Sequence, residues 1–132
     1  MSFQDSAHLA IRIRRSADEV YDYVSNPENL PEWAAGLGGS VEQRDGVWWA
    51  ESPMGEVQVS FVEANAFRVA DHTVTLPDGQ RVLNPMRVLE HAEGCEVVFS
   101  LFRRPEMSSA DFERDGQTVE ADLARLKSLL EF

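Results

Sequence analysis

Cysteine and positive charge are both scarce in this sequence. Cys95 is the only cysteine among 132 residues, which excludes an internal disulfide and a metal cluster built on several cysteines. We expect Cys95 to fill space in a strand rather than to act as a nucleophile. The chain carries 12 basic and 23 acidic side chains, so its net charge of −11 repels nucleic-acid phosphates and anionic lipid headgroups. We therefore predict that it binds no nucleic acid.

Long apolar runs and a targeting segment are missing too. No apolar stretch approaches the roughly 18 residues that a membrane span needs. The N-terminal residues lack the basic and apolar regions of a signal peptide. A cytoplasmic protein without membrane insertion is the resulting expectation. The length and the 43% hydrophobic content suit a single domain, residues 1–132, with one core.

The usual signatures of metal and cofactor sites are not found. His8, His72 and His91 fall on separate predicted strands and do not converge, so we predict no metal site. The glycines at positions 36, 38 and 39 lack the strand-to-helix setting and the lysine of a phosphate-binding loop. We therefore expect no cofactor.

The N-terminal part of the chain predicts one strand and two short helices. Apolar and polar side chains alternate between residues 8 and 15, which is typical of a strand with one buried face. Ser16 and Glu19 have the spacing of a capping box, which predicts a helix over residues 16–24. A second short helix is expected from residue 27 or 28 to about residue 35, with Trp33 turned inward.

The rest of the chain predicts an antiparallel meander and a long helix. Glycine turns at Asp45-Gly46, Asp78-Gly79 and Glu93-Gly94 separate strand-like segments. With two further breaks, the expected strands are 39–44, 47–52, 56–63, 67–76, 80–91 and 95–103. A final helix over residues 110–131, capped by Ser108 or Ser109, carries an apolar stripe. This order predicts an α+β domain.

The order of elements resembles the superfamily that includes START lipid-transfer domains, the birch pollen allergen family and the polyketide cyclase/dehydrase proteins. The resemblance covers nearly the whole chain and rests on residues 11–24 (IRIRRSADEVYDYV), 27–33 (PENLPEW) and 122–131 (DLARLKSLLE). It implies a helix-grip fold, in which a curved seven-stranded antiparallel sheet wraps around the C-terminal helix. It also implies a cavity between sheet and helix, which such proteins often use for lipids, hormones or polyketide-like molecules.

Strand pairing indicates which polar side chains would face such a cavity. If Asp78-Gly79 is a two-residue turn, Met86 faces Asp71 and Asn84 faces Thr73. The turn at Glu93-Gly94 places Met86 opposite Leu101, on the core face. Asp71, Thr73 and Asn84 would then be polar contacts of a ligand, because buried polar groups need partners. The alternative is a bulge near residues 70–73 that turns Asp71 outward.

Apolar side chains are candidates for the cavity wall. Trp48 and Trp49 are adjacent and point to opposite faces, and a turn at Pro53-Met54-Gly55 places Trp49 beside Val59 on the core face. The tryptophans could equally be ordinary core residues. Arg103-Arg104 could receive an acidic ligand group or simply balance Glu106. The predicted apolar wall comprises Trp33, Trp49, Met86, Phe99, Leu101 and Phe112.

Three functions remain open at this point. The first is binding of a small hydrophobic or aromatic molecule, lipid or polyketide-like, between the sheet and the C-terminal helix. The second is an enzyme resembling polyketide cyclases with Asp71 as general base, which requires that Asp71 is inward and desolvated. The third is a protein-interaction domain resembling co-chaperone domains, which requires a large exposed apolar patch. Either a monomer or a homodimer is compatible with each.

Overall fold

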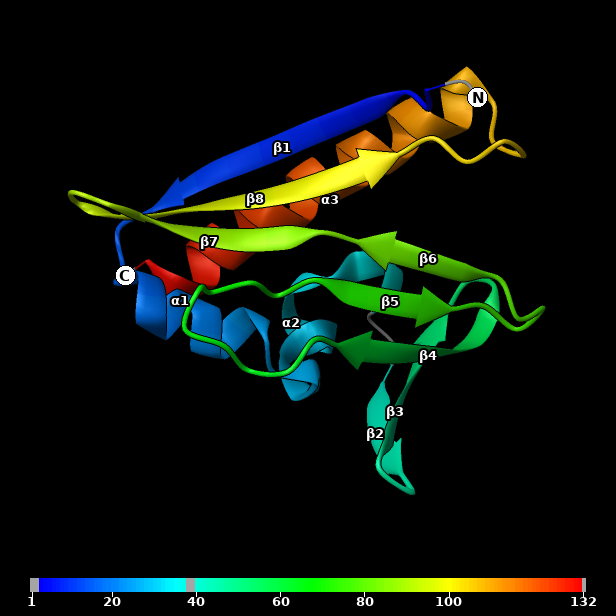
Figure 1. Ribbon diagram of the computed structural model, residues 1–132, viewed down its shortest axis with the longest axis horizontal. Helices are drawn as coiled ribbons and strands as arrows, with labels where there is room; N and C mark the ends of the chain where they lie inside the picture. The colour runs from blue at the N-terminus through cyan, green and yellow to red at the C-terminus, as the bar shows by residue number, and fades with distance from the viewer. Residues whose placement is uncertain (1–2, 38–39, 132) are drawn as a thin grey trace.

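The computed structural model describes residues 3–37 and 40–131 (Figure 1). Short turns join most of its strands, and a long helix closes the chain. The first half comprises β1 (Ser6–Ile13), α1 (Ala17–Val24), the 3₁₀ turn η1 (Pro27–Asn29), α2 (Leu30–Trp33), the 3₁₀ turn η2 (Ala35–Leu37), β2 (Val41–Arg44), β3 (Val47–Ser52) and β4 (Gly55–Phe61). The second half comprises β5 (His72–Thr75), β6 (Arg81–Asn84), β7 (Met86–His91), β8 (Gly94–Phe102) and α3 (Ser109–Leu130). The predicted strand 39–44 begins at Gly39, which lies outside the described residues.

The strands form two antiparallel sheets, one of which packs against α3. One sheet has the order β1-β8-β7 and the other the order β2-β3-β4-β5-β6. Figure 1 shows α3 behind β1 and β8, and it packs against both strands. The predicted α+β class, with antiparallel strands against a long C-terminal helix, is therefore confirmed. No helix in the described part of the chain is both long and apolar enough to span a membrane.

The predicted strand 80–91 is divided at Pro85 into β6 and β7. Proline has no N–H to donate to a ladder, so the pairing changes there: β6 pairs with β5, whereas β7 pairs with β8. The described residues consequently hold eight strands, where the sequence predicted seven. Three backbone hydrogen bonds cross the division, from Ala70 N to Met86 O (2.8 Å), from Val88 N to Arg68 O (3.1 Å) and from Ser100 N to Pro85 O (2.9 Å).

The hairpin between β3 and β4 turns in two residues rather than three. Ser52 pairs with Gly55, so Trp48 lies opposite the buried Val59 and Trp49 lies opposite Gln58. The prediction that Trp49 faces the core is therefore wrong, because a one-residue shift exchanges the two faces of a strand. The indole of Trp49 instead lies under the guanidinium of Arg44, 4.6 Å from the ring centre.

The same kind of shift occurs between β5 and β6. The Asp78-Gly79 turn lies within a longer connection, closed by a hydrogen bond from Leu76 N to Gln80 O (2.8 Å). His72 therefore pairs with Asn84, and Thr73 pairs with the exposed Leu83. The predicted inward direction of Thr73 is wrong, whereas Asn84 and His72 share the inner face. Between β7 and β8 the shift is two residues, so Met86 pairs with Phe99 instead of Leu101 and the faces are unchanged.

Both principal helices begin at the caps that the sequence predicts. The hydroxyl of Ser16 accepts a hydrogen bond from Glu19 N (3.2 Å) at the start of α1. At the start of α3, the hydroxyl of Ser108 accepts from Asp111 N (3.0 Å), and the Asp111 carboxylate accepts from Ser108 N (3.3 Å). These reciprocal bonds satisfy N–H groups that a helix cannot satisfy itself.

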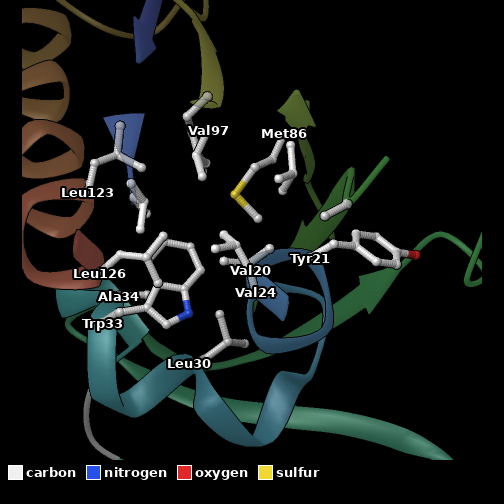
Figure 2. Packing of buried hydrophobic residues seen from close by; sticks show 14 of the residues in the cluster. Val20, Tyr21, Val24, Leu30, Trp33, Ala34, Met86, Val97, Leu123 and Leu126 are labelled. Atoms are coloured by element: carbon white, nitrogen blue, oxygen red, sulfur yellow. The ribbon is translucent and has the colours of Figure 1, made fainter. Parts of the chain in front are cut away.

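The hydrophobic core occupies the region beside the C-terminal half of α3. Figure 2 shows side chains from three helices meeting the inner face of the sheet there. Burial of these apolar groups supplies the main stabilising free energy of the domain. The central residues are Val20 and Val24 of α1, Leu30 and Trp33 of α2, Leu123 and Leu126 of α3, and Met86 and Val97 of the sheet.

The turn between β7 and β8 depends on Gly94. Gly94 has φ +152° and pairs with His91. A Cβ at this position would overlap the carbonyl oxygen of Ile13, where β1 leads into α1. The backbone of the turn therefore lies directly against the end of β1, and only glycine leaves room for this approach.

Candidate functional site

A pocket of about 510 Å³ lies beside the N-terminal half of α3, next to the core. Its walls come from α2, α3, both sheets and the turn between β3 and β4. Most of the lining is apolar, and several charged or polar side chains interrupt it. The lining residues include Leu30, Trp33, Leu37, Val57, His72, Val74, Arg81, Asn84, Phe99, Leu101, Arg104, Asp115, Val119 and Asp122.

His72 is the most deeply buried polar residue of this lining, at 3% exposure. Its ring stacks on Phe61 with 4.7 Å between ring centres, and the Phe99 ring meets it edge-on at 5.9 Å. The ring atom Nδ1 lies 3.1 Å from the carbonyl oxygen of Ala70. Burial lowers the pKa of His72, against the opposing effects of that hydrogen bond and of the neighbouring Asp71 charge. His72 is therefore a neutral, rigidly held imidazole at the pocket wall.

Two carboxylates of α3 face the pocket from the opposite wall. Asp115 and Asp122 are seven positions apart, which places them on one face of the helix at about 10 Å separation. Asp122 is 7% exposed, and its Oδ1 accepts a hydrogen bond from Ala35 N (3.1 Å). Burial raises the pKa of Asp122, and burial likewise raises that of Asp115, although the Arg104 charge opposes the latter shift. A buried carboxylate with a raised pKa that lines a pocket is a candidate functional group.

We predict that Asp122→Asn stabilises the protein at neutral pH. The asparagine oxygen can still accept the hydrogen bond from Ala35, while the cost of burying a charge disappears. Functional groups often reduce stability, and their replacement commonly adds roughly 0.5–2 kcal/mol to the free energy of unfolding. Urea denaturation of both proteins at pH 7 measures the difference.

The pH dependence of this difference has a definite sign. The folded-state pKa of Asp122 lies above its unfolded value, so the wild type loses stability as pH rises through the folded pKa. The advantage of Asp122→Asn should thus grow from acid to neutral pH. Glu120→Gln, an exposed change on the same helix, should stay within about 0.5 kcal/mol of the wild type. A destabilised Asp122→Asn protein at pH 7 contradicts the prediction.

Four residues predicted from the sequence as ligand contacts line the pocket. They are Trp33, Asn84, Phe99 and Leu101. Met86 is fully buried in the core beside the pocket, and Phe112 of α3 is half-buried outside the lining. Trp49 and Thr73 face away, for the register reasons given above. The part that the four lining residues take in binding stays a prediction.

Asp71 is not directed into the pocket, and its predicted position is wrong. The segment before β5 pairs with β7 through a bridge between Val69 and Arg87, which places Asp71 on the outer side with Arg87. Its carboxylate accepts hydrogen bonds from Met86 N (2.9 Å) and from the Arg87 guanidinium (3.2 and 3.3 Å). The alternative prediction, that Asp71 points outward, is thus correct, although the cause is a register shift and not a bulge. A general base at Asp71 requires the inward position, so a cyclase of that kind loses its motivating observation.

Two further side chains of the pocket lining, those of Arg104 and His72, bear on the sequence predictions. Arg104 borders the pocket, as the acidic-ligand interpretation requires, but its Nε also pairs with Glu106 at 2.9 Å, as the alternative requires. His72 lies on the inner face of β5, opposite Asn84, because the pairing of β5 with β6 is shifted by one residue from the predicted one. In the described residues no three His, Cys, Asp or Glu side chains are grouped as metal ligands.

Comparison with known proteins gives one family match and many matches of fold. Residues 4–131 match a family model described as polyketide cyclase / dehydrase and lipid transport. No curated protein matches the chain significantly. An uncharacterised Bacillus thuringiensis protein superposes with a TM-score of 0.74 at 16% identity, covering 96% of this chain and 98% of that one.

Two further solved structures share the fold. A START superfamily protein from Mycobacterium smegmatis has a TM-score of 0.72 at 11% identity, covering 95% of this chain and 96% of its own. Truncated norcoclaurine synthase from Thalictrum flavum has a TM-score of 0.68 at 17% identity, covering 100% of this chain and 98% of its own. At these identities the likeness concerns the fold alone. The predicted helix-grip fold and superfamily resemblance are confirmed.

Proposed function

The chain belongs to the polyketide cyclase/dehydrase and lipid-transport family, and on this premise we propose that it binds a small, largely apolar molecule in the pocket beside α3. The single observation that carries this proposal is the pocket itself. Its volume of about 510 Å³ lies within the roughly 300–1,000 Å³ of typical small-molecule sites.

The composition of the lining supports an apolar ligand with a polar group. Trp33 and Phe99 offer aromatic surface, and Val74 and Leu101 add aliphatic surface. Several polar side chains come from opposite walls, a distribution that can orient a ligand within a largely apolar site. Fold likeness to a synthase and to a START protein is compatible with either binding or catalysis, because one fold serves many activities.

Titration with the neutral fluorescent probe N-phenyl-1-naphthylamine tests the proposal. We expect saturable fluorescence enhancement with one site per chain and a Kd on the order of 1–100 μM, the range of a modest apolar contact without optimised polar groups. Saturating probe should also raise the melting temperature, because a molecule that binds only the folded state stabilises it. A non-saturating signal without a change in melting temperature contradicts the proposal.

A further inference from the structure

The tautomer of His72 follows from its hydrogen bond. A carbonyl oxygen only accepts, so Nδ1 must carry the proton that it donates to Ala70 O. In the neutral ring Nε2 then holds a lone pair and is an acceptor. The described residues supply no hydrogen-bond donor to Nε2. His72 is 3% exposed and lines the pocket. Of its two ring nitrogens, Nδ1 makes a hydrogen bond and Nε2 makes none within the described residues.

The neighbours of His72 determine the side from which a hydrogen-bond donor can approach Nε2. Phe61 covers one face of the imidazole, and Phe99 meets the ring edge-on. The backbone carbonyl of Ala70 takes the Nδ1 side. A donor supplied from the pocket would give Nε2 the hydrogen bond that the described residues leave unmade, which is worth about 0.5–1.5 kcal/mol.

The charges around the pocket disfavour an anionic ligand group in this part of it. Asp122 presents a second acceptor, because Ala35 N occupies Oδ1 and the described residues offer no donor to Oδ2. Asp115 adds a further carboxylate on the same helix face. Of the arginines at the pocket, Arg104 is paired with Glu106 and Arg81 is exposed at the rim. The polar groups of the lining thus include acceptors at His72 and Asp122, together with one buried donor without a partner in the described part of the chain, the indole N–H of Trp33.

We propose that the ligand is an apolar molecule with a hydroxyl group, most simply a phenol, whose O–H donates a hydrogen bond to Nε2 of His72. This inference rests on the proposed function and adds the chemical class of the ligand. The aromatic ring of the ligand lies against the apolar wall of the pocket, and its hydroxyl contacts the imidazole of His72, which Phe61, Phe99 and Ala70 hold in place. His72 is a ligand-binding residue in this role, and Asp122 provides a second acceptor for a ligand with two hydroxyls.

Three naphthalenes that differ in one substituent test the proposal: 2-naphthol, 2-methoxynaphthalene and 2-naphthoate. Each is measured by displacement of N-phenyl-1-naphthylamine from the wild-type protein. We expect 2-naphthol to bind about tenfold more tightly than 2-methoxynaphthalene, since one hydrogen bond to a buried acceptor is gained. 2-Naphthoate should bind most weakly, because its charge meets Asp115 and Asp122.

Substitution of His72 then assigns the effect to Nε2. In His72→Asn the side-chain amide can still donate to Ala70 O, but the asparagine side chain is shorter than the imidazole and its oxygen does not reach the position of Nε2. The tenfold preference should therefore disappear. His72→Phe keeps the contact with Phe61 and should behave alike. The control His91→Asn changes an exposed histidine outside this pocket and should keep the preference. Melting temperatures of all three variants establish that they are folded.

Each other outcome has a separate meaning. Equal affinity of 2-naphthol and 2-methoxynaphthalene, or a preference that survives His72→Asn, overturns the proposed hydrogen bond and leaves the binding function intact. Tightest binding of 2-naphthoate also overturns it and points to Arg81 and Arg104. If no naphthalene and no N-phenyl-1-naphthylamine binds, the proposed function itself fails.

Discussion

Gly94→Ala should lower the free energy of unfolding by about 4 kcal/mol, among the larger effects of a single substitution. Two causes add. Alanine disfavours the backbone conformation at φ +152°, and its Cβ would overlap Ile13 O and lie 3.0 Å from Arg14 Cα and 3.1 Å from Arg15 N. These are backbone atoms of the connection into α1, so relief requires movement of β1 or α1. Urea denaturation with the wild type as reference measures the loss.

Gly46→Ala is the matched control for backbone conformation. Gly46 also has positive φ, +79°, but a Cβ there meets nothing within 4 Å. We expect Gly46→Ala to cost only about 1–2 kcal/mol, the usual penalty for a left-handed residue. The difference between the two variants then reports the steric overlap. Equal losses for both would show that the turn between β7 and β8 can move away from β1.

Val74→Trp should weaken binding of N-phenyl-1-naphthylamine by more than about thirtyfold, which is roughly 2 kcal/mol. Val74 lies on β5 between Val59 and Val82, is half-buried and lines the pocket. An indole at this position would enter the space that the ligand requires. Because it fills a void rather than packed core, the change should alter the melting temperature little.

Thr75→Trp provides the comparison for this occlusion. Thr75 is the next residue of β5, also half-buried, and its side chain points to the opposite face, outside the pocket lining. Its tryptophan should leave probe affinity within about twofold of the wild type. Undiminished binding to a folded Val74→Trp protein would falsify the location of the site. Weakening by both variants would indicate an effect on β5 as a whole.

Local rules explain what the sequence could predict about this fold. The caps at Ser16 and Ser108 and the turn at Asp45-Gly46 each depend on residues close together in the chain, and the structure contains all three. The helix-grip arrangement followed from the order of elements. Pro85 was visible too, but a break in a long strand depends on which neighbours pair on either side. The sequence pattern does not specify those neighbours.

The candidate site was harder to predict because it depends on strand register. A one-residue error at the β3–β4 and β5–β6 turns exchanged the two faces of the strands. Trp49 and Thr73 were therefore predicted to point inward, and the inward position of His72 was not predicted. The two-residue error at the β7–β8 turn kept the faces, so Phe99 was placed correctly. Asp122 had a usable signal, since it is spaced with Val119 and Leu126 along the buried face of α3.

The strands of the domain form two ladders that meet at Pro85, where backbone hydrogen bonds still join them. The β1-β8-β7 sheet with α3 is one, and the β2-to-β6 sheet is the other. The pocket takes its lining from both, with His72 and Val74 on one side and Phe99 and Asp122 on the other. In the proposed function a ligand contacts both sheets at once, so its binding stabilises the contact between them together with the folded state as a whole. On that proposal, the resistance of the two sheets to separation rises with ligand concentration.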